Sequence, residues 1–518
     1  MQSDRLDVRY FTMNDDATAV QEFSRIRWTF PMAIGLGTTL VYLAFLAPGI
    51  YSIDGNSMLG LAESLAGHFS IVLPPDCSGI IGRGGHLYSM WYPLLSFLAV
   101  PFVAVGLALA HWFHLPGHFV AAVCALPLSA LLTGATTAAV AILAVQLGAT
   151  LRGAWLAAIA YAFGTIALNY ARSFYCEPLL AFLTIAGVCL AASKVRKRLA
   201  WLTACTALAV LAKPTGIILG PIVSGYFLLK RRTWKEIVLP MFGSAIGVGL
   251  YAIYNFFRFG NPLNFGPPDA FTIRGFPAGA AGLLISPGRG LVWYCLPLVL
   301  CVVALPRALK AATLETLMIV AVFLAYLGIY GCWSYWEGGW SWGPRFLLPA
   351  LPAVAALLGL LRGKWVRALA LFAVIGFVVN APTLVSFYER YYAEMNQQGV
   401  SVHTQLWSVR EAPLLHAWGA AYREFEDART HDVRELFSAR EGAAKSIDSS
   451  RALRVVAVWW WVLPIAHIPR WIGAAFSFAV LLLGLFVLRI SFLMATREAS
   501  GTGELISEGN SIARVRAD

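Results

Sequence analysis

The chain has 518 residues, of which 59% are hydrophobic and only 13% are charged, whereas soluble domains carry roughly 25% charged residues. Its apolar runs are long enough to span hydrocarbon, which excludes an ordinary soluble protein and predicts an all-α polytopic membrane protein. The net charge of +12 does not indicate a nucleic-acid partner. The Lys and Arg residues cluster in short loops between apolar runs, as the positive-inside rule requires.

Residues 1–27 mix acidic residues with arginines, and the apolar segment that follows is too long for a signal-peptide core. We therefore expect a cytoplasmic N-terminal segment and a first span that stays in place. Asp54, in the stretch IYSIDGN at residues 50–56, comes where this span leaves the bilayer. A carboxylate beside a membrane span is costly unless it is solvated, paired or used, so Asp54 is a candidate functional residue. The alternative is a helix-capping Asp in a turn.

Basic clusters predict which ends of the later helices lie inside. An even number of spans must separate residues 194–198, 230–235, 307–310 and 362–367 if all four lie in the cytoplasm. This parity places Glu177 and Lys213 outside. It also requires that one early apolar segment does not cross. We expect this to be 93–113, because Trp and His at its end suit a membrane interface. The first outer loop then covers about 51–118 and carries surface helices.

The remaining boundaries follow from composition. We expect a transmembrane catalytic region at 28–385 and a small, partly helical extracytoplasmic subdomain at 386–455, which is polar but too aromatic for plain disorder. An interfacial segment and the final span are predicted at 456–493. A disordered cytoplasmic tail is predicted at 494–518. No internal repeat is evident.

With this topology, ionisable residues collect on one outer face. They are Asp54, Asp76, Glu177, Glu337, Arg83, Arg172, Lys213, Arg289 and Arg345. Cytosolic nucleotide sugars cannot reach that face, so an activated group has to arrive on a lipid such as a polyprenyl phosphate. Transfer from this donor needs a carboxylate to take the acceptor's proton, cations for the leaving phosphate and an apolar groove for the tail. All three are available in the sequence.

The order of motifs over roughly residues 28–385 resembles the GT-C glycosyltransferase superfamily. It is most similar to the bacterial protein mannosyltransferase-like and aminoarabinose transferase-like members. The motifs after Asp54 are YARSFYCE ending at Glu177, AKPTG around Lys213, FGNPL at 259–263, SPGRG around Arg289 and GGWSWGPR ending at Arg345. The resemblance implies a GT-C-like helix bundle with a long first extracytoplasmic loop. One departure is that the usual acidic pair after the first span is here Asp54-Gly55.

The resemblance favours Asp54 as the general base and Glu177 as a second catalytic carboxylate, although Glu177 could form only a loop ion pair. Donor phosphate binding is expected from Lys213, Arg345, Arg83, His86 and Arg289. Two of these residues have an alternative role: Lys213 could snorkel from a helix end, and Arg289 could anchor a lipid headgroup. No metal motif is present, so a divalent metal is not expected.

The predicted function is inverting transfer of a sugar from a polyprenyl-phosphate-linked donor to a hydroxyl acceptor, which could be a glycan, a lipid or a protein of the cell envelope. The predicted place is the extracytoplasmic face of the inner (cytoplasmic) membrane. The partners are membrane lipids, the lipid-linked donor and the acceptor, with no nucleic acid. Two alternatives stay open: a transporter or flippase of a lipid-linked or anionic solute, and a ligase that moves a whole glycan from its lipid carrier.

Overall fold

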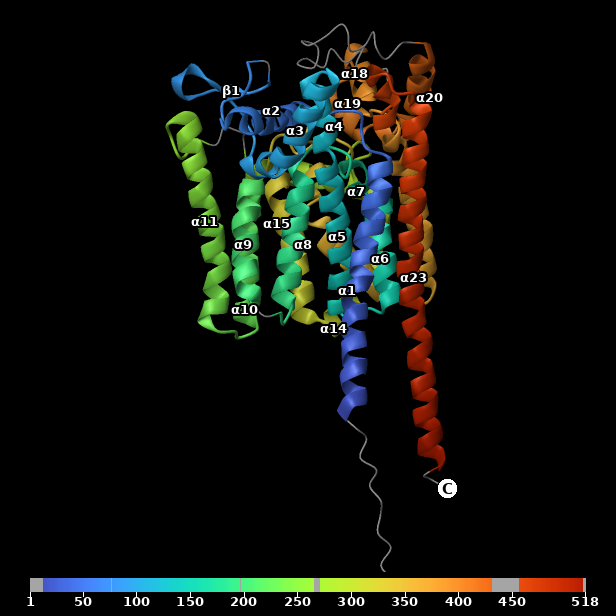
Figure 1. The fold of residues 1–518 in the computed structure, drawn as a ribbon. Coiled ribbons are helices and arrows are strands. Elements are labelled where there is room, and N and C mark those ends of the chain that lie inside the picture. Colours follow the sequence, from blue (N-terminus) through green and yellow to red (C-terminus); the bar gives the residue numbers. More distant parts are fainter. Residues whose placement is uncertain (1–12, 76, 196, 265–270, 431–455, 516–518) are drawn as a thin grey trace, which may run out of the picture.

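The computed structural model describes residues 13–75, 77–195, 197–264, 271–430 and 456–515 (Figure 1). This part of the chain is almost wholly helical, and its one small sheet pairs β1 (Ile80–Ile81) with β2 (Leu87–Tyr88). The prediction of an all-α polytopic membrane protein is confirmed. In the described residues, six helical segments are long and apolar enough to cross a membrane: Pro93–Phe113, Gly117–Gln146, Trp234–Phe259, Thr313–Gly331, Lys364–Leu384 and Arg470–Arg497.

These six segments correspond to the longer helices of the bundle. They are α3 (Pro93–Phe113), α4 (Gly117–Ala125) with α5 (Pro127–Gln146), α11 (Trp234–Phe259), α15 (Thr313–Gly331), α17 (Lys364–Asn380) with η7 (Ala381–Leu384), and most of α23 (Arg470–Val515). The other helices of the bundle are α1 (Met13–Ala44), α6 (Leu151–Gly164), α8 (Cys176–Ala192), α9 (Arg198–Ala212), η2 (Pro214–Ile218), α10 (Leu219–Leu229), α12 (Phe276–Ile285), α13 (Leu291–Tyr294), η4 (Leu296–Leu300), α14 (Cys301–Ala311), α16 (Leu351–Ala356) and η6 (Leu357–Leu360).

The remaining elements are short or lie at one end of the bundle. They are α2 (Ile53–His68), η1 (Arg83–Gly85), α7 (Ala167–Tyr170), η3 (Ile273–Gly275), η5 (Arg345–Leu347), α18 (Glu389–Gln397), α19 (Val402–Trp407), α20 (Pro413–Thr430) and η8 (Trp459–Ala466). Figure 1 shows α2, α3, α4, β1, α18 and α19 together at the upper end of the bundle. The loops from α8 to α9 and from α10 to α11, which carry two of the basic clusters, lie at the opposite end.

Small residues let the helices approach closely. A Cβ on Gly134 of α5 would lie 2.0 Å from the Thr39 hydroxyl of α1, and one on Gly243 of α11 would lie 2.3 Å from the Thr203 carbonyl oxygen of α9. Such contacts leave no room for a larger side chain, and small residues drive helix association in hydrocarbon. The bundle is therefore held by close backbone contact as well as by apolar side chains.

The segment 93–113 forms one helix, α3, which packs against α2 and α4. Its length and composition would allow it to cross a membrane, while Figure 1 places it at the end of the bundle with α2 and α4. Its expected place on the membrane surface stays a prediction. The described part of 386–455 contains α18, α19 and α20.

Candidate active site

Asp54 lies in the first turn of α2, and that turn is fixed by its cap. The Ser52 side chain accepts a hydrogen bond from the Gly55 backbone N–H at 3.0 Å. Ser52 is therefore the N-cap that the turn needs. Asp54 is free for another role, and the alternative of Asp54 as the capping residue is not what the structure shows.

Four of the predicted residues come together in one cluster. Arg345 Nη1 donates to Asp54 Oδ2 at 3.0 Å, and Lys213 Nζ donates to Glu177 Oε1 at 2.8 Å. Arg345 Nε lies 3.5 Å from the same Glu177 oxygen. The charges therefore alternate from Asp54 through Arg345 and Glu177 to Lys213. We call these four residues the charge cluster.

Each member comes from a helix end. Asp54 and Glu177 lie in the first turns of α2 and α8, Lys213 is the C-cap of α9 immediately before η2, and Arg345 begins η5. Pro214 explains why α9 stops at Lys213, since a proline cannot continue the hydrogen bonding of a helix. Helix ends at the same end of the bundle bring together residues far apart in the sequence.

The members of the charge cluster differ in exposure. The Asp54 side chain is 23% exposed, whereas that of Glu177 is 2% exposed. Burial raises the pKa of the Asp54 carboxyl; the Arg345 and Lys213 charges oppose this rise and the Glu177 charge adds to it. Asp54 is thus the accessible carboxylate, and Glu177 is a buried counter-ion shared by two cations.

Aromatic rings enclose the cations. The Lys213 ammonium lies 4.5 Å from the centre of the Phe346 ring, and the Arg345 guanidinium carbon lies 4.9 Å from the same centre. The Tyr175 ring lies 4.8 Å from that guanidinium carbon. Ring faces stabilise cations and exclude water. Neither Phe346 nor Tyr175 was predicted as a site residue, although Tyr175 lies within the motif that ends at Glu177 and Phe346 directly follows Arg345.

Three predicted phosphate ligands lie elsewhere. Arg83 and His86 are exposed in the turn between β1 and β2, where the Arg83 guanidinium lies 5.7 Å from the centre of the Phe256 ring of α11. Arg289 is buried, and it donates to the carbonyl oxygens of Glu337, Gly288 and Gly339 and to the Tyr392 hydroxyl. None of these three residues joins the charge cluster in this structure.

Arg172, another cation of the predicted outer face, is not part of the charge cluster. Arg172 is buried and donates to the backbone carbonyls of Thr383 and Ala457. Asp76 lies outside the described residues. In the described part of the chain, no group of three or more His, Cys, Asp or Glu side chains could hold a metal ion; independence from divalent metal stays a prediction.

Comparison with known proteins gives no family model and no curated protein that matches the sequence. The chain is similar in structure to ArnT from Cupriavidus metallidurans in the apo state, with 15% identity, a TM-score of 0.48 and coverage of 91% of this chain and 78% of that one. The same protein bound to undecaprenyl phosphate gives 14% identity, a TM-score of 0.48 and the same coverage.

A further similarity is to the oligosaccharyltransferase of Archaeoglobus fulgidus in the apo form, with 13% identity, a TM-score of 0.40 and coverage of 85% of this chain and 64% of that one. ArnT and this enzyme are both GT-C glycosyltransferases, the superfamily that the sequence motifs resemble. All these TM-scores lie below 0.5, so the functional argument rests on the geometry of the charge cluster.

Proposed function

We propose that the protein is an inverting glycosyltransferase that moves a sugar from a polyprenyl-phosphate-linked donor to a hydroxyl acceptor. The observation that carries the proposal is the charge cluster, in which one accessible carboxylate lies beside two cations that share a buried counter-ion. Acid–base transfer and stabilisation of a leaving phosphate need these two kinds of group side by side.

In the proposed reaction, the Asp54 carboxylate takes the proton of the acceptor hydroxyl. The acceptor oxygen forms a bond to the anomeric carbon while the bond from that carbon to the phosphate oxygen breaks. The electron pair leaves with the polyprenyl phosphate, whose charge Lys213 and Arg345 stabilise. The Lys213 ammonium donates one hydrogen bond to Glu177, and an ammonium carries three donors, so further N–H groups remain for the phosphate.

Glu177 has a positioning role in this proposal. Its side chain is 2% exposed and contacts both Lys213 and Arg345, so it holds the cations where the phosphate binds. The reaction is proposed for the extracytoplasmic face of a bacterial-type inner membrane. The charge cluster lies at the end of the bundle opposite the basic loops 194–198 and 230–235, which supports that placement (Figure 1).

A liposome assay tests the function. The purified chain is reconstituted with a lipid extract that contains polyprenyl-phosphate sugars, and mass spectrometry follows sugar on the lipid and on added acceptors. We expect transfer to a hydroxyl acceptor without net movement of solute across the bilayer. Solute movement without transfer would replace the proposal by a transporter, and transfer of an intact oligosaccharide would identify a ligase.

A further inference from the structure

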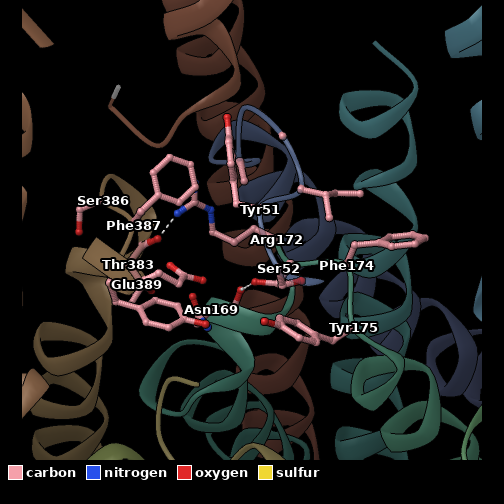
Figure 2. A pocket seen from close by; sticks show the side chains of 15 residues that line it. Tyr51, Ser52, Asn169, Arg172, Phe174, Tyr175, Thr383, Ser386, Phe387 and Glu389 are labelled. Carbon is pink, nitrogen blue, oxygen red and sulfur yellow. Dashed lines mark hydrogen bonds between the residues drawn. The ribbon is translucent and has the colours of Figure 1, made fainter. Parts of the chain in front are cut away.

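A pocket adjoins the charge cluster and plays no part in the proton transfer proposed above. It lies between the turn after α1, the segment 169–175 and the start of α18, and Figure 2 shows the side chains that line it. Ser52, which caps the Asp54 helix, lies on one wall. Tyr175, whose ring contacts Arg345, also lines it. A molecule in this pocket would therefore sit next to the charge cluster.

Three residues of the wall have a buried side-chain atom without a hydrogen-bond partner among the described residues: Asn169, Arg172 and Tyr388. The Asn169 side chain belongs to a residue that is 3% exposed, and its Nδ2 has no hydrogen-bond partner among the described residues. The same is true of Arg172 Nε in a residue that is 4% exposed. A buried donor without a partner costs about 1–3 kcal/mol. All three residues line the pocket, so a ligand with acceptor oxygens would lie beside these donors.

A carboxyl belongs to the same wall. Glu389, in the first turn of α18, lines the same pocket, and Figure 2 shows its carboxyl on the side where Asn169 lies. Burial raises the pKa of Glu389 to about 7, while a hydrogen bond from the Glu389 backbone and the Arg172 charge oppose that rise. The pocket thus offers hydrogen-bond donors and a carboxyl that is only partly ionised near neutral pH.

This combination selects an uncharged ligand that is rich in hydroxyl groups. A hydroxyl both donates and accepts, so it can pair with the Glu389 carboxyl and the Asn169 amide together. A phosphate would meet the Glu389 carboxyl, and both Arg172 amino groups already donate to backbone carbonyls. A cation would meet the Arg172 charge. Tyr175, Phe387 and Tyr388 add ring surface to the wall for the apolar edge of a sugar.

We propose that this pocket binds a sugar ring, with Glu389 and Asn169 as the residues that recognise its hydroxyl groups. The inference rests on the proposed function and deepens it, because it assigns a place to the sugar. The ring could belong to the donor, next to the phosphate, or to a sugar acceptor. Both have the same chemistry in the pocket, and the experiment separates them.

The test is saturation-transfer NMR on the purified full chain with a panel of neutral methyl glycosides as probes. We expect at least one glycoside to bind the wild type and to bind Glu389→Gln and Asn169→Ala at least tenfold more weakly. Glu394→Gln is the matched control, since Glu394 lies on the same helix but pairs with Arg390 and Arg423 near the surface. Two pocket variants are used so that, if one of them does not fold, the other still tests the proposal.

A second set of binding measurements, with the corresponding sugar 1-phosphates, decides whether the ring belongs to the donor or to the acceptor. If the ring is the donor's, the phosphate should strengthen binding, and Lys213→Gln should remove that gain. Equal binding with and without phosphate assigns the ring to the acceptor. Both results support the sugar site. The inference is overturned if no glycoside binds the wild type, or if binding survives in both pocket variants.

Failure of the inference and of the proposed function can be told apart. Glycoside binding does not need turnover, so Asp54→Asn should keep it while losing transfer. Binding without any transfer by the wild type would reject the enzyme and keep the pocket. Transfer that is unchanged in Glu389→Gln and Asn169→Ala, together with no glycoside binding, would reject the pocket and keep the enzyme.

Discussion

Asp54 and Glu177 are carboxylates of the same cluster, but their surroundings give them different roles. The Asp54 side chain is 23% exposed and open to solvent, whereas the Glu177 side chain is 2% exposed. A general base has to contact the acceptor hydroxyl. We therefore assign proton transfer to Asp54 and the positioning of cations to Glu177.

Removing the Glu177 charge should destabilise the protein. Glu177→Gln leaves Lys213 and Arg345 with less compensation, and breaking one side of a buried ion pair costs about 3–5 kcal/mol. We expect a lower melting temperature in detergent. Because a phosphate can replace the lost charge, undecaprenyl phosphate should raise the melting temperature of the variant more than that of the wild type. An unchanged melting temperature would contradict the positioning role.

The pH dependence of transfer should report the Asp54 carboxyl. Burial raises its pKa above the usual value of about 3.9. Since only the ionised form can take a proton, kcat/KM should rise with pH through a pKa above that value. The Glu177 charge contributes to the rise, so Glu177→Gln should move the acidic limb to lower pH. An acidic limb that stays in place in this variant would argue against coupling between the two carboxylates.

At the scale of elements, Gly55 explains the departure from the usual acidic pair. A Cβ on Gly55 would lie 2.5 Å from the Ile50 side chain and 3.0 Å from the Phe174 carbonyl oxygen. A side chain at position 55 would point into this contact between α2 and the segment before α8. A second carboxylate has no room there.

Gly55→Ala should therefore destabilise the protein by about 1–3 kcal/mol, the usual cost of overpacking. Thermal unfolding in detergent measures the change. Gly67→Ala in the same helix is the control, because a Cβ there meets nothing within 4 Å. Equal melting temperatures for the two variants would show that α2 is free to shift.

The sequence motifs predicted four members of the charge cluster, because each of them adjoins a helix end that local patterns indicate. The same reasoning also grouped Arg83, His86 and Arg289 with them. What separates the two sets is three-dimensional: the β1–β2 turn lies over α11, and Arg289 is occupied by carbonyl oxygens. Glu389 and Asn169 carry no local signal for the pocket, since it forms where the turn after α1, the segment 169–175 and the start of α18 come together.

For the whole molecule, the basic clusters give a prediction of helix parity, because charge asymmetry between loops is a one-dimensional signal. Whether α3 crosses the membrane or lies on its surface does not follow from the sequence, because its composition suits both a span and a surface helix. Contacts with α2 and α4 place it at the end of the bundle where the charge cluster lies (Figure 1). The topology prediction therefore depends on this helix.

Cysteine labelling tests that topology. Single cysteines at His86, Pro116 and Arg152, which are exposed in the structure, are introduced into a cysteine-free variant and treated with a membrane-impermeant thiol reagent. We expect labelling from outside at positions 86 and 116 and protection at 152 until the membrane is opened. If position 116 is protected together with 152, α3 crosses the membrane and the proposed face of the site is wrong.

The most direct test of the central claim is transfer by Asp54→Asn at saturating donor, measured together with binding of undecaprenyl phosphate. Asp427→Asn on α20 is the matched control, since Asp427 pairs with Arg390 outside the charge cluster. We predict that Asp54→Asn binds the phosphate within about twofold of wild type and loses transfer by about 10²–10⁴-fold, the range for a general base, while Asp427→Asn keeps both. Near-normal transfer by Asp54→Asn would contradict the account.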